Sequence, residues 1–120
     1  MLLNAHAPEQ GFIFLRVYET NGIEGRFEIQ AEDLNKIFNW NLVKEGNSKD
    51  AITPHYEELK KYFLNHSGFS SLQGQHNITF KGVDILSTGL GDYIQLFFDL
   101  DNVDPIPDKM EVTYNVAFKE

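Results

Sequence analysis

The sequence predicts an α+β fold that is mainly β: an antiparallel β-sandwich or curled sheet, with two helices inserted after the first hairpin. The first observation is that apolar and polar residues alternate near both ends of the chain, which is the period of a β-strand. The second is that two segments between these ends carry apolar residues at helical spacing. The third is that consecutive strand segments are joined by short turns, which favours antiparallel pairing.

The first strands are predicted from residues 12–30. Residues 12–19 alternate but carry bulky side chains on both faces, which indicates a largely buried strand. Asn21-Gly22 is a strong signal for a tight turn, and residues 23–30 alternate as a half-exposed strand. We therefore predict a β-hairpin over 12–30, preceded by a flexible N-terminal arm over residues 1–10.

Two helices are expected next. In "AEDLNKIF" the apolar residues Leu34, Ile37 and Phe38 lie at helical spacing and acidic residues come early, where the helix dipole favours them. The polar stretch over residues 39–50 is predicted to be a loop. Thr53-Pro54 then offers a hydroxyl cap and a proline for the first turn of a helix over 54–66, which Gly68 is expected to end.

The remainder of the chain returns to the strand period. Strands are predicted over residues 76–81, 83–87, 93–100 and 110–118, with a turn at "STGLGD" and a proline-rich acidic connection at "DNVDPIPD". The predicted core consists of Phe27, Leu34, Leu59, Phe63, Leu96, Phe98, Val112 and Tyr114.

Size and charge limit the classes of function. A chain of 120 residues with 42% hydrophobic residues is long enough for one domain with one core, so residues 1–120 are taken as a single domain. The formal net charge of −8 disfavours nucleic acid and anionic lipid surfaces as partners. The absence of cysteine excludes disulfides, thiolate zinc sites and cysteine nucleophiles.

The four histidines are the first candidate metal ligands. No pair has the four-residue spacing of a helical metal site, and His55 and His66 would lie about 16 Å apart along a helix. Cleavage after Ala5 would place His6 at a new N-terminus, where its amine and imidazole suit Ni(II) or Cu(II). The alternative is that His6 belongs to the flexible arm and binds nothing.

The acidic connection is the second candidate. Asp99, Asp101, Asp104 and Asp108 supply oxygen ligands of the kind that Ca²⁺ takes from loops. The spacing lacks the glycine and the distal glutamate of an EF-hand loop, and Asp and Pro also simply form turns. A calcium site at Asp99, Asp101 and Asp104 and an ordinary turn therefore both remain open.

No catalytic motif is present: the chain lacks Gly-x-Ser-x-Gly, a Walker loop and His-Glu-x-x-His. We therefore expect a protein that is not an enzyme and has no resident cofactor. Trp40 lies between two asparagines. It is either an exposed binding aromatic or a loop residue that packs over the core.

Several stretches carry a resemblance to a known family. "AHAPEQGFIFLRV" at 5–17, "IEGRFEIQAEDLNKIF" at 23–38, "AITPHYEELKKYFLNH" at 51–66, "DYIQLFFDL" and "PDKMEVTYNVAF" resemble, in order, the extracytoplasmic domain of HupE/UreJ-type bacterial membrane proteins. Relatives are expected to carry an acidic, EF-hand-like stretch before the second helix. This chain has "VKEGNSKDAIT" there, with only Glu45 and Asp50 as carboxylates.

The resemblance implies a periplasmic or outer-face location, with a signal peptide removed before this domain and membrane helices following Glu120. The implied partners are the protein's own membrane-embedded C-terminal part and another protein, and the family name links it to nickel handling. We therefore expect a non-enzymatic extracytoplasmic domain for binding, sensing or assembly. The alternatives are a small metal carrier with ligands among His6, Asp99, Asp101 and His76, or a β-sandwich that binds a protein or peptide along an exposed sheet edge.

Overall fold

The computed structural model describes residues 2–3, 11–18, 22–42, 49–89 and 91–114. It confirms a mainly β fold of antiparallel strands, with the helices inserted after the first hairpin. The elements are β1 (Leu2–Leu3), β2 (Phe12–Tyr18), β3 (Gly22–Gln30), α1 (Ala31–Phe38), α2 (Lys49–Ile52), the 3-10 turn η1 (Thr53–His55), α3 (Tyr56–His66), β4 (Ser67–Ser71), β5 (Gly74–His76), β6 (Ile78–Thr88), β7 (Gly91–Leu100) and β8 (Glu111–Tyr114).

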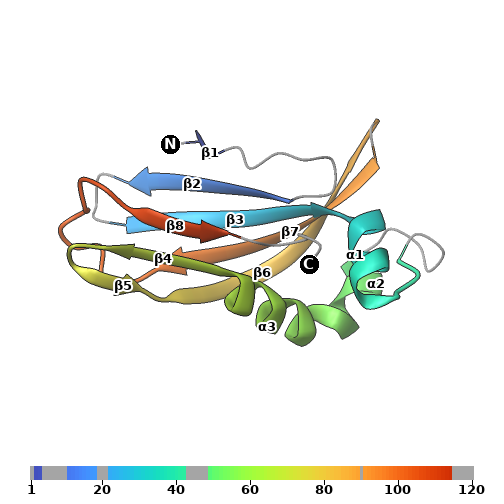
Figure 1. Ribbon diagram of the computed structural model, residues 1–120. Helices are drawn as coiled ribbons and strands as arrows, with labels where there is room; N and C mark the ends of the chain where they lie inside the picture. The colour runs from blue at the N-terminus through green and yellow to red at the C-terminus, as the bar shows by residue number, and fades with distance from the viewer. Residues whose placement is uncertain (1, 4–10, 19–21, 43–48, 90, 115–120) are drawn as a thin grey trace.

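The strands form two sheets (Figure 1). Sheet A has five strands in the order β1-β2-β3-β7-β6, and sheet B has three in the order β5-β4-β8. Sheet B and α3 lie on one side of sheet A, while α1 and α2 gather at one end (Figure 1). The two sheets are joined through their aromatic side chains, since Phe69 of β4 lies 5.6 Å from Phe98 of β7 between ring centres.

The first hairpin forms as predicted, with β2 and β3 antiparallel and Phe12 paired with Glu28. Its turn at residues 19–21 lies outside the described residues. Leu2 and Leu3 pair with Phe14 and Ile13 and so add a short strand to the edge of sheet A. Residues 1 and 4–10 of the expected arm lie outside the described part.

The helical region differs from the prediction in three places. Helix α1 forms where predicted and ends at Asn39, whose φ of 59° lies in the left-handed region that ends many helices. Lys49–Ile52 form a helical turn, α2, where a loop was predicted. This turn runs directly into η1, so Thr53 does not take the cap position that was predicted for it. The residue before η1 is Ile52, and the residue before α3 is His55.

Helix α3 ends at His66, as predicted, but the expected role of Gly68 was wrong. Ser67 is already extended, so the helix ends before Gly68 is reached. The Ser67 hydroxyl donates a 2.5 Å hydrogen bond to the carbonyl of Phe63, which satisfies one of the acceptors left open at a helix end. Gly68 instead lies in β4, a strand that the sequence did not predict because "SGFSS" holds one large apolar residue.

The later strands are longer than predicted. Residues 78–81 and 83–87 of the two predicted short strands belong to one strand, β6, with an irregularity between Phe80 and Gly82, whereas His76 is the last residue of β5. Strand β7 forms as predicted and pairs with β3 on one side and β6 on the other. Of the predicted last strand, Glu111–Tyr114 form β8, and residues 115–118 lie outside the described part.

The core lies between the two sheets and α3. Six of the predicted core residues are fully buried: Phe27, Leu34, Leu59, Phe63, Leu96 and Phe98. Val112 and Tyr114 are half-buried and pack against them. The Phe27 ring lies at the centre, with centroids 4.5 Å from Phe63 of α3 and 4.7 Å from Phe98. Burial of each such ring contributes about 1.5–3 kcal/mol to folding.

Close packing also explains a glycine in β3. A Cβ atom at Gly25 would collide with the ring of Phe98 and would lie 2.9 Å from Leu15.

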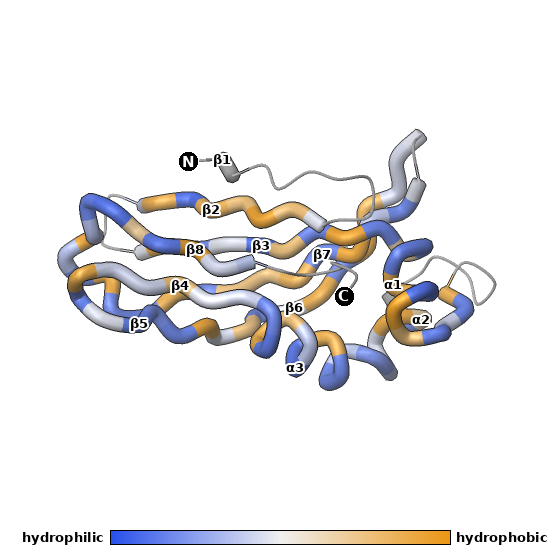
Figure 2. Tube along the Cα trace, viewed as in Figure 1, coloured by the Kyte–Doolittle hydropathy of each residue, from blue (hydrophilic) through white to orange (hydrophobic). Residues whose placement is uncertain are grey.

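Figure 2 shows hydrophobic residues along the strands of sheet A and hydrophilic residues over much of α3. In the described ranges no helix is long and apolar enough to cross a membrane.

Candidate functional site

The side of sheet A that faces away from sheet B carries an ordered set of polar and aromatic side chains. Along β3, Ile23, Phe27 and Ile29 are buried toward the core. Because side chains alternate along a strand, Glu24, Arg26 and Glu28 lie on the opposite side. We call this side the outer face; by strand register it consists of Phe12, Phe14, Arg16 and Tyr18 of β2, Glu24, Arg26, Glu28 and Gln30 of β3, Tyr93, Gln95, Phe97 and Asp99 of β7, and Thr79, Gly82, Asp84 and Leu86 of β6. Lys81 has no register partner in β7, and its contacts with Glu24 and Asp99 place its side chain on the same face.

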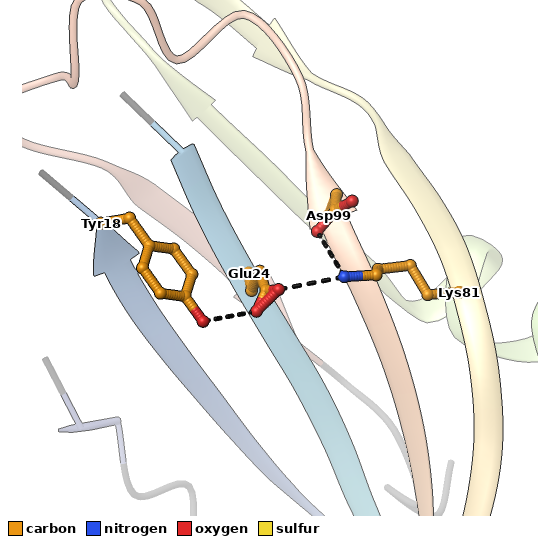
Figure 3. A network of polar contacts seen from close by, with 4 residues as sticks. All are labelled: Tyr18, Glu24, Lys81 and Asp99. Atoms are coloured by element: carbon orange, nitrogen blue, oxygen red, sulfur yellow. Dashed lines mark hydrogen bonds and ion pairs between the residues drawn. The ribbon is translucent and has the colours of Figure 1, made fainter. Parts of the chain in front are cut away.

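A polar network crosses the outer face from strand to strand (Figure 3). The hydroxyl of Tyr18 donates a 2.6 Å hydrogen bond to Glu24 Oε1. Lys81 Nζ donates to Glu24 Oε2 at 3.0 Å and lies 3.5 Å from Asp99 Oδ1. Four strands are thereby linked through their side chains. Lys81 stands at the irregularity of β6, between Phe80 and Gly82.

The electrostatic consequences follow from these contacts. Hydrogen bonds from Tyr18 and Lys81 lower the pKa of Glu24. The bond to Glu24 and the charge of Asp99 raise the pKa of Lys81. The bond to Glu24 also raises the pKa of Tyr18. All three groups therefore keep their ordinary charge at neutral pH.

Arg26 is held in place on two sides. Its Nε donates a 2.5 Å bond to Glu28 Oε2, and its guanidinium lies over the Phe14 ring, 4.3 Å from the centroid. Glu28 also accepts a 2.8 Å bond from Gln95 and is 7% exposed, so its buried charge is paired and hydrogen-bonded as such charges require. The Arg26 side chain is 40% exposed.

The outer face is hollowed beside Arg26. A hollow of about 630 Å³ is lined by Phe14, Leu15, Arg16, Tyr18, Glu24, Gly25, Arg26, Lys81, Gly82, Val83, Asp84, Phe97 and Phe98. Gly82 opens this space, because a Cβ atom at that position would meet nothing within 4 Å. Arg16 borders the hollow from β2, with its guanidinium 5.0 Å from the centre of the Tyr18 ring.

The aspartates of the acidic connection are engaged separately. Asp99 pairs with Lys81 on the outer face. The Asp101 carboxylate accepts bonds from the backbone N–H of Asn77 at 2.5 Å and from its side chain at 3.1 Å. Asp104 is exposed. Across the described residues, no group of three or more His, Asp and Glu side chains is placed to hold a metal ion.

Three of the histidines have structural contacts, and His6 lies outside the described residues. His76 is 1% exposed, and its ring nitrogens lie 3.0 Å from the Asp101 carbonyl oxygen and 2.7 Å from Ser71 Oγ. His66 stacks on Tyr62 at 4.2 Å between ring centres.

Trp40 has an anchoring role. It is half-buried and stacks between Phe38, at 4.4 Å, and His55, at 3.9 Å. Of the two interpretations of this tryptophan, the structure therefore agrees with a loop residue that packs over the core.

None of the residues that line the hollow was predicted as a site residue from the sequence. The available signal was the alternation in residues 12–19 and 23–30, which separates a polar and aromatic face from an apolar one. That signal does not say which strands lie side by side. Arg26 and Phe97 are paired across β3 and β7 although many residues separate them in the chain.

No protein-family model, curated protein or solved structure matches this chain. The resemblance to the HupE/UreJ type therefore stays a prediction.

Proposed function

We propose that this chain is a non-enzymatic binding domain whose binding surface is the outer face of sheet A. The observation that carries the proposal is the hollow of about 630 Å³ bordered by Phe14, Phe97, Arg16 and Arg26. Aromatic residues and arginine are enriched in protein interfaces and among the residues that dominate their binding energy. Another protein is therefore the partner class that fits this surface best.

The order of the side chains supports the same proposal. Glu28 and Phe14 hold Arg26, and Glu24 and Asp99 hold Lys81. Side chains that are already fixed lose less conformational entropy when a partner binds. A solvent-exposed face with no binding role gains little from such pairs, since exposed ion pairs contribute only about 0–1 kcal/mol to stability.

The location and the natural partner are proposed from the resemblance alone. We propose that the domain lies outside the cytoplasmic membrane and contacts the membrane-embedded part of the same protein. Cell fractionation of the natural gene product tests the location. Recovery of this domain with the cytoplasmic fraction would overturn the location and leave the binding face untouched.

Binding at the outer face can be tested with small uncharged aromatic probes. Indole and benzyl alcohol are titrated to millimolar concentration into the ¹⁵N-labelled chain, and amide shifts are followed by NMR. We expect the shifts to gather at Arg26, Gly82 and Phe97. Shifts scattered over the molecule, or gathered on sheet B, would contradict the proposal.

A variant that fills the hollow provides the specificity control. Gly82→Val adds a side chain into open space and should weaken probe binding by roughly tenfold or more. Gly68→Val is the matched control, because a Cβ atom at Gly68 in sheet B also meets nothing within 4 Å. The control should bind the probes as the parent chain does.

A further inference from the structure

Some of the N–H donors of Arg26 have no hydrogen-bond partner among the described residues. A guanidinium carries five N–H donors in a planar fork. In Arg26 the Nε–H bonds to Glu28, while the terminal Nη groups have no hydrogen-bond partner anywhere in the described residues. The Cζ atom of Arg26 lies over the Phe14 ring, 4.3 Å from its centroid, and the N–H donors of a guanidinium lie in the plane of the group.

Arg16 and the terminal donors of Arg26 are the open cationic groups of the hollow, although Nε of Arg26 is paired with Glu28. Lys81 is occupied by Glu24 and Asp99. Glu24 is in turn occupied by Tyr18 and Lys81. Arg16 is exposed and forms no ion pair within the described ranges, although its guanidinium lies over Tyr18.

The acceptors around the hollow are similarly engaged. Glu28, behind Arg26, accepts from both Arg26 and Gln95. Asp84, on the far strand, takes the backbone N–H of Ile85 at 2.8 Å with Oδ1. Within the described residues, neither carboxylate bonds to the terminal Nη groups of Arg26.

The charges around the hollow are more evenly balanced than those of the chain. The lining holds three basic residues, Arg16, Arg26 and Lys81, and two acidic ones, Glu24 and Asp84. Glu28 and Asp99 do not line the hollow, but they lie 2.5 Å from Arg26 and 3.5 Å from Lys81. The whole chain holds 10 basic and 18 acidic residues. The lining cation that has no carboxylate partner within the described residues is Arg16.

We propose that the hollow binds a carboxylate carried on an apolar group of the partner, held by Arg26 and Arg16 beside the rings of Phe14 and Phe97. The occupant is an acidic segment of a protein in which a carboxylate adjoins an aromatic or aliphatic side chain. Arginine suits this role because its fork binds a carboxylate through two parallel hydrogen bonds. This inference rests on the proposed function of the outer face and specifies the chemistry of the partner.

The test compares two probes that differ in charge. Phenylacetate and phenylacetamide have nearly the same shape, but only phenylacetate carries the carboxylate. In NMR titrations of the whole chain we expect phenylacetate to bind at the hollow about tenfold more tightly, because hydrogen bonds to charged groups are the stronger ones. Equal affinity would overturn the carboxylate inference and leave the binding face in place.

Variants of the two arginines assign the effect to its residues. Arg16→Gln and the double variant Arg26→Gln/Glu28→Gln should each remove most of the preference for phenylacetate over phenylacetamide. The double variant removes both charges of the pair, so no buried carboxylate is left without its cation. Lys61→Gln is the matched control, because it also removes one positive charge, at an exposed position of α3. It should leave the preference for phenylacetate over phenylacetamide unchanged.

Two further outcomes would overturn the inference. Glucuronate presents a carboxylate on a polar ring, and it should bind more weakly than phenylacetate. Tighter binding of glucuronate would indicate an acidic sugar instead of a protein segment. If neither phenylacetate nor the uncharged aromatic probes shifts the amides of the hollow, both this inference and the proposed function fail.

Discussion

Lys81 of β6 and Glu24 of β3 form an ion pair that passes over β7, with Nζ and Oε2 3.0 Å apart. The pair joins residues that are 57 positions apart in the chain. It lies at the irregularity in β6, where Lys81 has no partner in β7 while Phe80 pairs with Phe98 and Gly82 with Phe97. This contact sets one border of the hollow on the outer face.

The pKa shift of Glu24 predicts a pH dependence. Its pKa in the folded chain is lowered from the ordinary 4.5, chiefly by the bond from Tyr18. The stabilisation is therefore complete above pH 4.5 and is lost as the pH falls through the folded value. Chemical denaturation should show the parent chain more stable than Glu24→Gln at pH 7 by less than about 1 kcal/mol, because the pair is exposed. The difference should vanish in acid; a difference that grows in acid would contradict this account.

The buried hydroxyl of Tyr114 predicts a stabilising substitution. This oxygen has no hydrogen-bond partner among the described residues, and burial raises the pKa of Tyr114. Tyr114→Phe should raise the free energy of unfolding at pH 7 by about 1 kcal/mol. Tyr93→Phe is the control and should bring no gain, because the Tyr93 hydroxyl accepts a bond from Gln30 at 3.2 Å.

The same tyrosine predicts an effect in alkali. An unfolded chain ionises its tyrosines near pH 10, whereas the buried phenol stays neutral to higher pH. Tyr114 therefore contributes a loss of stability as the pH rises above about 10. Urea denaturation between pH 9 and 11 should show a smaller loss for Tyr114→Phe than for the parent chain. An equal loss in both would mean that the phenol is solvated in the folded protein.

The packing of Gly25 predicts a destabilising substitution. Gly25→Ala places a methyl group against the ring of Phe98, which is fully buried and cannot move aside freely. Thermal unfolding should show a loss of about 1–3 kcal/mol, the usual cost of overpacking a core. Gly68→Ala, in open space, should change stability by no more than about 0.5 kcal/mol. Similar values for both variants would refute the close contact.

Calcium titration tests the acidic connection. We expect no stoichiometric Ca²⁺ binding by calorimetry, because Asp99 is paired with Lys81 and Asp101 is bonded to Asn77. Binding that disappears in Asp101→Asn would restore the calcium site.

Ni²⁺ and Cu²⁺ are titrated in parallel into this chain and into a version that begins at His6. Tight binding by that version alone would support the metal-carrier alternative.

Segments with a strong local pattern were predicted correctly. The hairpin and α1 carry their periods within a few residues, so their local propensity can be recognised in the sequence. The burial of the two strands differs from the prediction, because β3 lies between β2 and β7, whereas Arg16 and Val17 of β2 are exposed. Strand β4 was missed because its polar sequence becomes a strand only by pairing with β5 and β8. Helix α2 was missed because four residues are too few to show a helical period.

The sequence by itself determined the fold class, most of the core and the division of β3 into an apolar and a polar face. Only the tertiary structure decided that Phe14, Arg26 and Phe97 lie in one row across three strands. The physical reason is that the alternation of side chains is set within one strand, whereas register is set between strands. Backbone hydrogen bonds and the packing of Phe27 against Phe63 and Phe98 select that register. The hollow exists because this register places Gly82 beside Phe97.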